Sequence, residues 1–196
     1  FMSAVLSADM DNTDKVVTLI DECRSMGLAV LPPTVNRSEY RFTAADDQTV
    51  VYGIGAIKGV GESAIEAILE ARSEGGPFRD LWDFCRRVDP HRANRRVLEA
   101  LIRAGALDGL GENRATLMAK LPSAVKLAEQ HRETQAAGQV DLFGGAVDSV
   151  AAEPDPQLAA RVWDEWEEDE RLQGEKETLG LYLTGHPINR YDAELE

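Results

Sequence analysis

The stretch Ile54-Gly55-Ala56-Ile57-Lys58-Gly59-Val60-Gly61-Glu62-Ser63-Ala64-Ile65 decides the fold expected for this chain. From Gly53 onward the apolar residues recur at helical spacing and are punctuated by glycines. We therefore expect a short helical turn, a Gly-Val-Gly hairpin and a helix that starts after Gly61. The first backbone N–H groups of such a helix have no partner within it and would point outward.

A hairpin of this kind is suited to hold an anion. Glycine at positions 59 and 61 allows a tight turn with positive φ and lets a phosphate oxygen approach the amides, and Lys58 adds positive charge. The candidate phosphate-binding residues are Lys58, Gly59, Val60, Gly61 and Glu62. A Gly-x-Gly also occurs in purely structural turns. The stretch lacks the third glycine of the dinucleotide-binding pattern and the lysine and hydroxyl of a P-loop.

Further helices are expected downstream from their apolar periodicity, over residues 81–88, over 97–102 and from about Asn113. Residues 94–121 repeat the helix, turn and helix more loosely, with Gly109-Leu110-Gly111 in the turn. Two phosphate-binding hairpins could grip the two strands of a duplex. The candidate DNA-binding residues in this second copy are Arg95, Arg96, Gly109, Gly111 and Arg114.

Residues 1–52 have a different pattern. Capping residues at 11–13 and apolar residues at helical spacing predict a helix that ends at Gly27. The β-branched and aromatic runs 40–42 and 49–52 predict a small strand pair joined through residues 44–48. The expected fold class is mainly α: short helices with a tandem helix-hairpin-helix, preceded by a small α+β piece.

Charge is unevenly distributed along the chain. The net charge is −14 overall, but it is −4 over residues 1–52, +1 over 53–120 and −11 over 121–196. The middle third holds the one basic island, in which seven arginines outnumber four acidic residues. The arginines are Arg79, Arg86, Arg87, Arg92, Arg95, Arg96 and Arg103. An acidic chain argues against extensive nucleic-acid contact. We therefore expect DNA to contact the middle third alone.

The segment after residue 135 reads as a linker, rich in glycine, alanine, proline and acids. Within it lies an extended pentapeptide, Gln139-Val140-Asp141-Leu142-Phe143, whose apolar pair could enter a hydrophobic pocket of a partner protein or pack back on the helices. A helix is expected to resume over residues 158–172. Its acidic face is read as a solvated surface or, less favoured, as a docking surface.

Several strings along the chain resemble one known family, the C-family alpha subunits of bacterial DNA polymerase III. These are Leu31-Pro32-Pro33, residues 51–62, Asn94-Arg95-Arg96-Val97-Leu98-Glu99, Ala104-Gly105-Ala106-Leu107-Asp108 and residues 175–187. They occur in the family's order and cover essentially the whole chain. Phe1 is no natural initiator, so we expect a piece of a longer protein.

The resemblance implies an organisation and a function. Residues 1–52 would end the fingers, 53–135 would form the tandem helix-hairpin-helix module that binds duplex (primer-template) DNA, 136–157 would be the linker, and 158–196 an acidic helix and lead-in to an oligonucleotide-binding fold. Residues 139–143 resemble the peptide that binds the ring-shaped β sliding clamp. The parent would be a cytoplasmic DNA-directed DNA polymerase (a nucleotidyltransferase) that meets other holoenzyme subunits in DNA replication.

No catalytic residue or cofactor is expected within this chain, because the resemblance places the aspartates that hold Mg²⁺ in the palm, upstream. Asp9 and Asp11 read as helix caps, the histidines lack partners at metal-ligand spacing, and Cys23 and Cys85 read as reduced core residues. No apolar run approaches a membrane span. The alternatives are a non-catalytic DNA-repair or adaptor protein, the error-prone alpha paralogue and, less favoured, a helix-hairpin-helix glycosylase.

Overall fold

The computed structural model describes residues 1–136 and 153–185. Its N-terminal part combines two helices with a small sheet in the order β1-β3-β2. Strand β1 runs parallel to β3, with Val30 opposite Val50, and β2 runs antiparallel to β3 with an irregularity between Ala44 and Asp46. The elements are α1 (Met2–Ala8), α2 (Thr13–Ser25), β1 (Ala29–Leu31), β2 (Thr43–Asp46) and β3 (Thr49–Val51).

Helix α2 begins and ends where the sequence predicts. The Asn12 side chain accepts a hydrogen bond from the Lys15 N–H (3.2 Å) and so caps the helix start. At the other end Gly27 has φ +77°, and the Leu28 N–H donates to the Cys23 carbonyl (2.9 Å). This arrangement satisfies the last carbonyls of the helix and turns the chain into β1.

The strand predicted over residues 49–52 is confirmed as β3, but its predicted partner is wrong in position and the sheet has one strand more than expected. The first strand of the hairpin is residues 43–46 rather than 40–42, and β1 adds a third, parallel strand within the described residues. Residues 40–42 instead pack against glycine. A Cβ on Gly53 would lie 2.6 Å from the Arg41 carbonyl carbon, and the Gly55 N–H donates to the Tyr40 carbonyl (2.9 Å).

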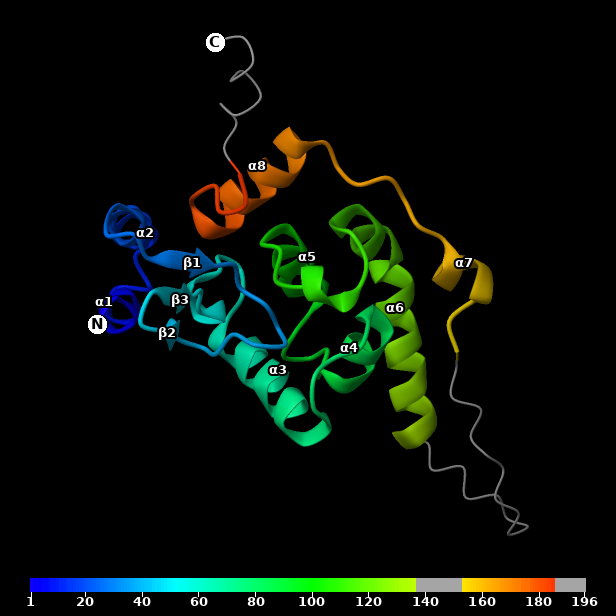
Figure 1. Cartoon of the computed structure of the whole chain (residues 1–196). Helices are drawn as coiled ribbons and strands as arrows, with labels where there is room; N and C mark the ends of the chain where they lie inside the picture. The colour runs from blue at the N-terminus through cyan, green and yellow to red at the C-terminus, as the bar shows by residue number, and fades with distance from the viewer. Residues whose placement is uncertain (137–152, 186–196) are drawn as a thin grey trace, which may run out of the picture.

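The remaining helices confirm the periodicity and the mainly α fold class. Asp80 and Asn94 cap α4 and α5 by accepting from the Asp83 and Val97 N–H groups at 2.7 and 3.2 Å. The helices α4, α5 and α6 pack together in the centre of the molecule (Figure 1). The elements are η1 (Ile54–Ala56), α3 (Glu62–Gly75), α4 (Leu81–Arg87), α5 (Arg95–Arg103), η2 (Asp108–Leu110) and α6 (Arg114–Ala136).

The helix predicted over residues 158–172 is wrong. The chain instead forms α7 (Pro156–Ala160), an extended segment over 161–167 and α8 (Glu168–Leu179). The extended segment crosses the start of α6: the Trp163 N–H donates to Thr116 Oγ1 (2.9 Å), and Asn113 Nδ2 donates to the Trp163 carbonyl (2.9 Å). These bonds to α6 replace those that a helix would make internally.

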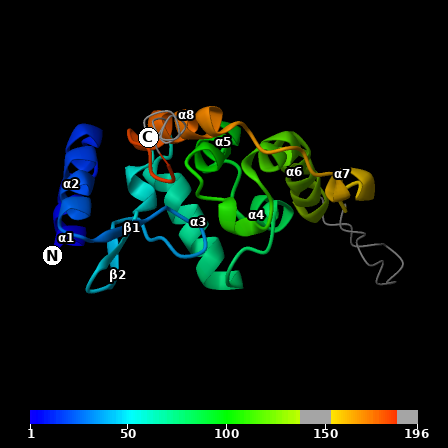
Figure 2. The same ribbon diagram turned by 45° about the horizontal axis from the view of Figure 1, so that its top comes forward.

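The buried apolar side chains form one continuous cluster that includes residues from Met2 to Leu181. Helix α8 packs against α5, and α7 lies at the opposite end of the molecule from α1 and α2 in both ribbon views (Figure 2). Elements from the N-terminal and C-terminal parts contribute to this same cluster. The expected division of the chain into four parts stays a prediction.

Lowering the pH should weaken the hydrogen bonds by which the Asp83 carboxylate stabilises α4. The Asp83 carboxylate is 5% exposed and accepts from the Arg79 N–H (3.2 Å) and from Arg87 Nη1 (3.0 Å). Burial alone would raise the pKa of Asp83, but these hydrogen bonds and arginine charges lower it overall. A lowered folded-state pKa means that Asp83 stabilises the fold above pH ~4 and that this contribution is lost as the pH falls further.

The variant Asp83→Asn tests this. At pH 7, urea unfolding should show that the free energy of unfolding of the variant is about 1.5–3 kcal/mol lower than that of the wild type, because buried hydrogen bonds to a charged group are lost. At pH 3 the difference from wild type should shrink. An equal difference at both pH values would contradict the assignment.

Candidate nucleic-acid interface

The first hairpin, residues 57–62, presents an open helix start. Gly59 has φ +85°, a conformation that favours glycine, and Val60 is buried beneath the turn. The hydrogen bonds of α3 begin with the Ala64 N–H donating to the Gly61 carbonyl (3.0 Å). A Cβ added to Gly61 would meet nothing within 4 Å. Among the described residues, the N–H groups of 61–63 have no acceptor and are therefore free to donate to an anion.

Two unpaired cations flank this hairpin. Lys58 is exposed, and its backbone N–H donates to the Thr178 carbonyl (2.8 Å) at the end of α8. A Cβ on Gly59 would lie 3.6 Å from the Ala100 side chain, so α5 packs against the turn. Arg96 is exposed one helical turn before Ala100, on the same face. In the described part of the chain neither Lys58 nor Arg96 forms an ion pair.

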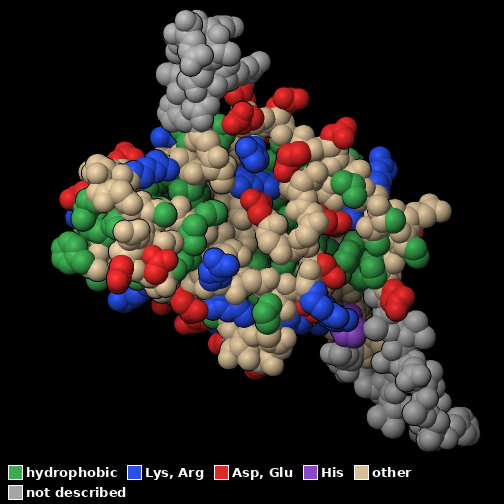
Figure 3. All heavy atoms as spheres, in the orientation of Figure 1, with side chains coloured by type: hydrophobic (Ala, Val, Ile, Leu, Met, Phe, Trp, Pro, Cys, Tyr) green, Lys and Arg blue, Asp and Glu red, His purple; other side chains and the backbone are tan. Residues whose placement is uncertain are grey.

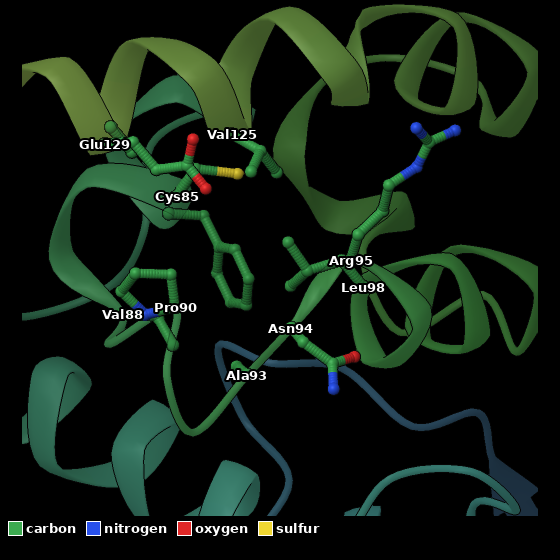
Figure 4. A pocket seen from close by; sticks show the side chains of 11 residues that line it. Cys85, Val88, Pro90, Ala93, Asn94, Arg95, Leu98, Val125 and Glu129 are labelled. Carbon is green, nitrogen blue, oxygen red and sulfur yellow. The ribbon is translucent and has the colours of Figure 1, made fainter.

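Arg95, a third predicted contact, lies elsewhere. Its Nε donates to Glu99 Oε1 (2.8 Å), and its side chain lines a cavity of about 130 Å³ between α4, α5 and α6. Arg95 and Glu129 stand on opposite sides of this cavity, with the Cys85 thiol and Leu98 between them (Figure 4). The structure therefore does not bring Arg95 together with Arg96.

The second hairpin differs from the first because its helix start is already occupied. The Glu165 carboxylate accepts hydrogen bonds from the Arg114 and Ala115 N–H groups at 3.2 and 3.1 Å, and Asn113 Oδ1 accepts from the Thr116 N–H (2.8 Å). An internal carboxylate thus takes the position expected for phosphate. The turn glycines Gly109 and Gly111 are exposed, and Gly111 has φ +88°.

Arg114 is buried rather than presented to solvent. It is 1% exposed, and its Nη2 lies 2.8 Å from Asp108 Oδ2 and 3.1 Å from Glu175 Oε1. Burial lowers the pKa of Arg114, but the hydrogen bonds and charges of these two acids raise it overall. The predicted contact between Arg114 and DNA is therefore corrected, because its guanidinium forms part of the core.

Lys120 is buried as well. Its ammonium group donates to Glu112 and to the Ala159 carbonyl, the latter at 2.7 Å. Arg114 and Lys120 are the first two basic residues that follow the second turn in the sequence. The structure uses both charges to hold α7 and α8 against α6, so this turn offers DNA little cationic surface.

The surface charge is mixed rather than uniformly basic. Figure 3 shows Lys and Arg side chains interspersed with Asp and Glu over the face in view, and acidic side chains gather over α8. Helix α8 opens with Glu168, Asp169 and Glu170.

The acidic pair Asp9 and Asp11 does not cap α2, because Asn12 does. Asp9 ends α1 and accepts from Lys15 Nζ (2.7 Å). No group of three or more potential ligand side chains within residues 1–136 and 153–185 could hold a metal ion. Cys23 and Cys85 are buried free thiols, and burial raises the pKa of Cys85 to about 12.

Two other sequence predictions reach the limits of the structure. The pentapeptide 139–143 lies outside the described residues. Within the described part, no helix is long and apolar enough to span a membrane.

Comparison with known proteins agrees with this geometry. Residues 27–117 match the helix-hairpin-helix motif family, which covers the first hairpin, α5 and the second turn. This part of the chain therefore carries a match to the helix-hairpin-helix class of motif.

The particular relatives are alpha subunits of DNA polymerase III. All of this chain aligns with those of Vibrio cholerae at 58% identity, Pseudomonas aeruginosa at 55% and Escherichia coli K12 at 55%. The family resemblance of the sequence is therefore confirmed. The chain spans only 17 to 18% of the length of these relatives.

Three residues that contact the elements around the two turns were given no separate role by the sequence: Glu165, Arg92 and Arg103. Glu165 belongs to an acidic run whose members look alike. The two arginines were visible only as members of the basic island. No local signal distinguishes them, because their partners lie 22 to 74 positions away in sequence.

The buried pair of Arg114 and Glu175 should dominate the stability of this region. Removing one partner leaves the other charge buried and unpaired. Glu175→Gln should therefore lower the free energy of unfolding, measured in urea, by about 3–5 kcal/mol. The matched control is Glu177→Gln, two residues along α8, whose exposed pair with Arg103 should contribute about 0–1 kcal/mol. Similar losses for both variants would contradict the buried-pair assignment.

Proposed function

We propose that this chain binds the phosphate backbone of duplex DNA through the first hairpin, without sequence readout. The observation that carries the proposal is the open start of α3 at Gly61, flanked by Lys58 and Arg96, which have no acidic partner among the described residues. Free amides at a helix start and adjacent cations suit a phosphate. The helix-hairpin-helix match supports this assignment.

The two hairpins contribute unequally to this proposal. The first supplies amides and two cations, with Glu62 exposed at the helix start and Val60 packed below. The second supplies at most its exposed glycines, Gly109 and Gly111. DNA would therefore be held mainly through one strand at this site.

The wider role follows from the relatives. We propose that the chain is part of a DNA-directed DNA polymerase alpha subunit and that it holds the duplex while catalysis takes place elsewhere in the parent. The Mg²⁺ that such a polymerase uses would bind outside this chain. The pentapeptide 139–143 would bind the β sliding clamp, so that the hairpin and the peptide together keep the enzyme on DNA. Contacts with other holoenzyme subunits belong to the same proposal.

DNA binding can be tested by charge reversal. Lys58→Glu with Arg96→Glu should weaken binding to a labelled 20-base-pair duplex about tenfold or more, and should flatten the salt dependence by about 0.9 per lost phosphate contact. Fluorescence anisotropy at several salt concentrations measures both quantities.

The matched control for this test is Arg37→Glu with Lys126→Glu. Both residues are exposed and lie outside the hairpin, and the net charge changes equally. Equal loss in the two double variants, or wild-type binding that is insensitive to salt, would overturn the proposal.

Clamp binding is tested separately, by titrating the chain against the sliding clamp. Gln139→Ala with Phe143→Ala should lower the affinity at least about tenfold, since a few anchor side chains dominate such interfaces. Asp148→Ala with Val150→Ala, in the same linker, is the control. Undiminished binding by the first double variant would exclude the pentapeptide as the anchor.

A further inference from the structure

Arg92 lies beside the first hairpin, although it belongs to the turn before α5. Its Nε donates to Ser63 Oγ at 3.2 Å, and Ser63 is the second residue of α3. Its two amino groups donate to Glu70 Oε2 at 2.6 Å and to Glu66 Oε2 at 2.8 Å. The guanidinium is thus held next to the open helix start by two carboxylates of the same helix.

Arg103 lies on the other side of the hairpin. It follows Ala100 on the face of α5 that contacts Gly59, and its Nη1 donates to Glu177 Oε2 at 3.1 Å. Glu177 precedes Thr178, whose carbonyl accepts from the Lys58 N–H. The hairpin is therefore bracketed by two arginines, and each of them is paired with acid.

The carboxylates of these ion pairs are exposed to solvent, whereas the Arg92 side chain is half-buried at 26% exposed. The carboxylate side chains of Glu66, Glu70 and Glu177 are 56%, 62% and 50% exposed. Exposed pairs contribute little to stability, because water and salt screen them. A phosphate offers a guanidinium the same pair of oxygen acceptors as a carboxylate. Exchange of one anion for the other at Arg92 and Arg103 therefore requires no change in the core.

We propose that Glu66, Glu70 and Glu177 are competing anions, which hold Arg92 and Arg103 ready beside the first hairpin until phosphates of duplex DNA displace them. This inference rests on the proposed DNA binding and adds a form of regulation to it. Competition lowers affinity at each phosphate, so that the duplex can move past the hairpin without being held tightly. It also reduces salt dependence, because each released carboxylate takes up a cation when a phosphate takes its place.

The test removes the competing charge at Arg92. Glu66→Gln with Glu70→Gln should tighten duplex binding about three- to tenfold and steepen the salt dependence by up to about 0.9. The matched control is Glu74→Gln with Glu133→Gln, two exposed glutamates that no arginine contacts among the described residues. The control makes the same change in net charge, and thermal melting verifies that all variants are folded.

A second comparison assigns the effect to Arg92. Introducing Glu66→Gln and Glu70→Gln together with Arg92→Ala should abolish the gain, whereas Arg92→Lys should retain part of it. Equal tightening in the test and control pairs, or a gain that survives Arg92→Ala, would overturn the inference.

The outcomes also separate this inference from the proposed function. If Lys58→Glu with Arg96→Glu weakens binding while the glutamate variants match their control, the DNA interface stands and the competition is wrong. If the wild type does not bind duplex at low salt, both are wrong.

Discussion

The arrangement of the second half of the chain depends on one buried ion pair, between Arg114 at the start of α6 and Glu175 in the middle of α8. Glu175 is fully buried, and its carboxylate also accepts from the Leu183 and Thr184 N–H groups at 2.8 and 3.0 Å. A buried charge is tolerated only when it is paired and hydrogen-bonded. The pair therefore places α8, and the segment after it, against the α5–α6 turn.

The burial of Arg114 explains why two turns with similar sequences, at residues 59–61 and 109–111, differ in structure. A Cβ on Gly105 would collide with Arg114 Nη2, so glycine makes room for the guanidinium. Glu165 then caps α6, and the second turn becomes a joint between helices. Within residues 1–136 and 153–185 the first hairpin has no such occupant, and its amides stay open at Gly61. The two copies are thus asymmetric: the start of α6 is capped by Glu165, whereas the start of α3 is open.

The positive charge beside the first hairpin is partly neutralised by acidic side chains. Lys58 and Arg96 are free cations among the described residues, while Arg92 and Arg103 carry acidic partners that solvent reaches. A chain with a net charge of −14 can in this way present a small cationic surface. In the function that we propose, phosphate contact there would position a duplex without reading its sequence. Such contact suits the DNA-holding role that we propose.

The sequence by itself determined the helices from α2 to α6 and the first hairpin, because caps such as Asn12, Asp80 and Asn94 and the apolar period act within a few residues. It did not reveal the strand β1–β3 pairing, the extended segment around Trp163 or the burial of Arg114. Those features depend on contacts between residues far apart in sequence, such as the 61 positions that separate Arg114 from Glu175. Only the tertiary structure decided which charges are buried and which stay exposed, since burial is a property of packing and not of local sequence.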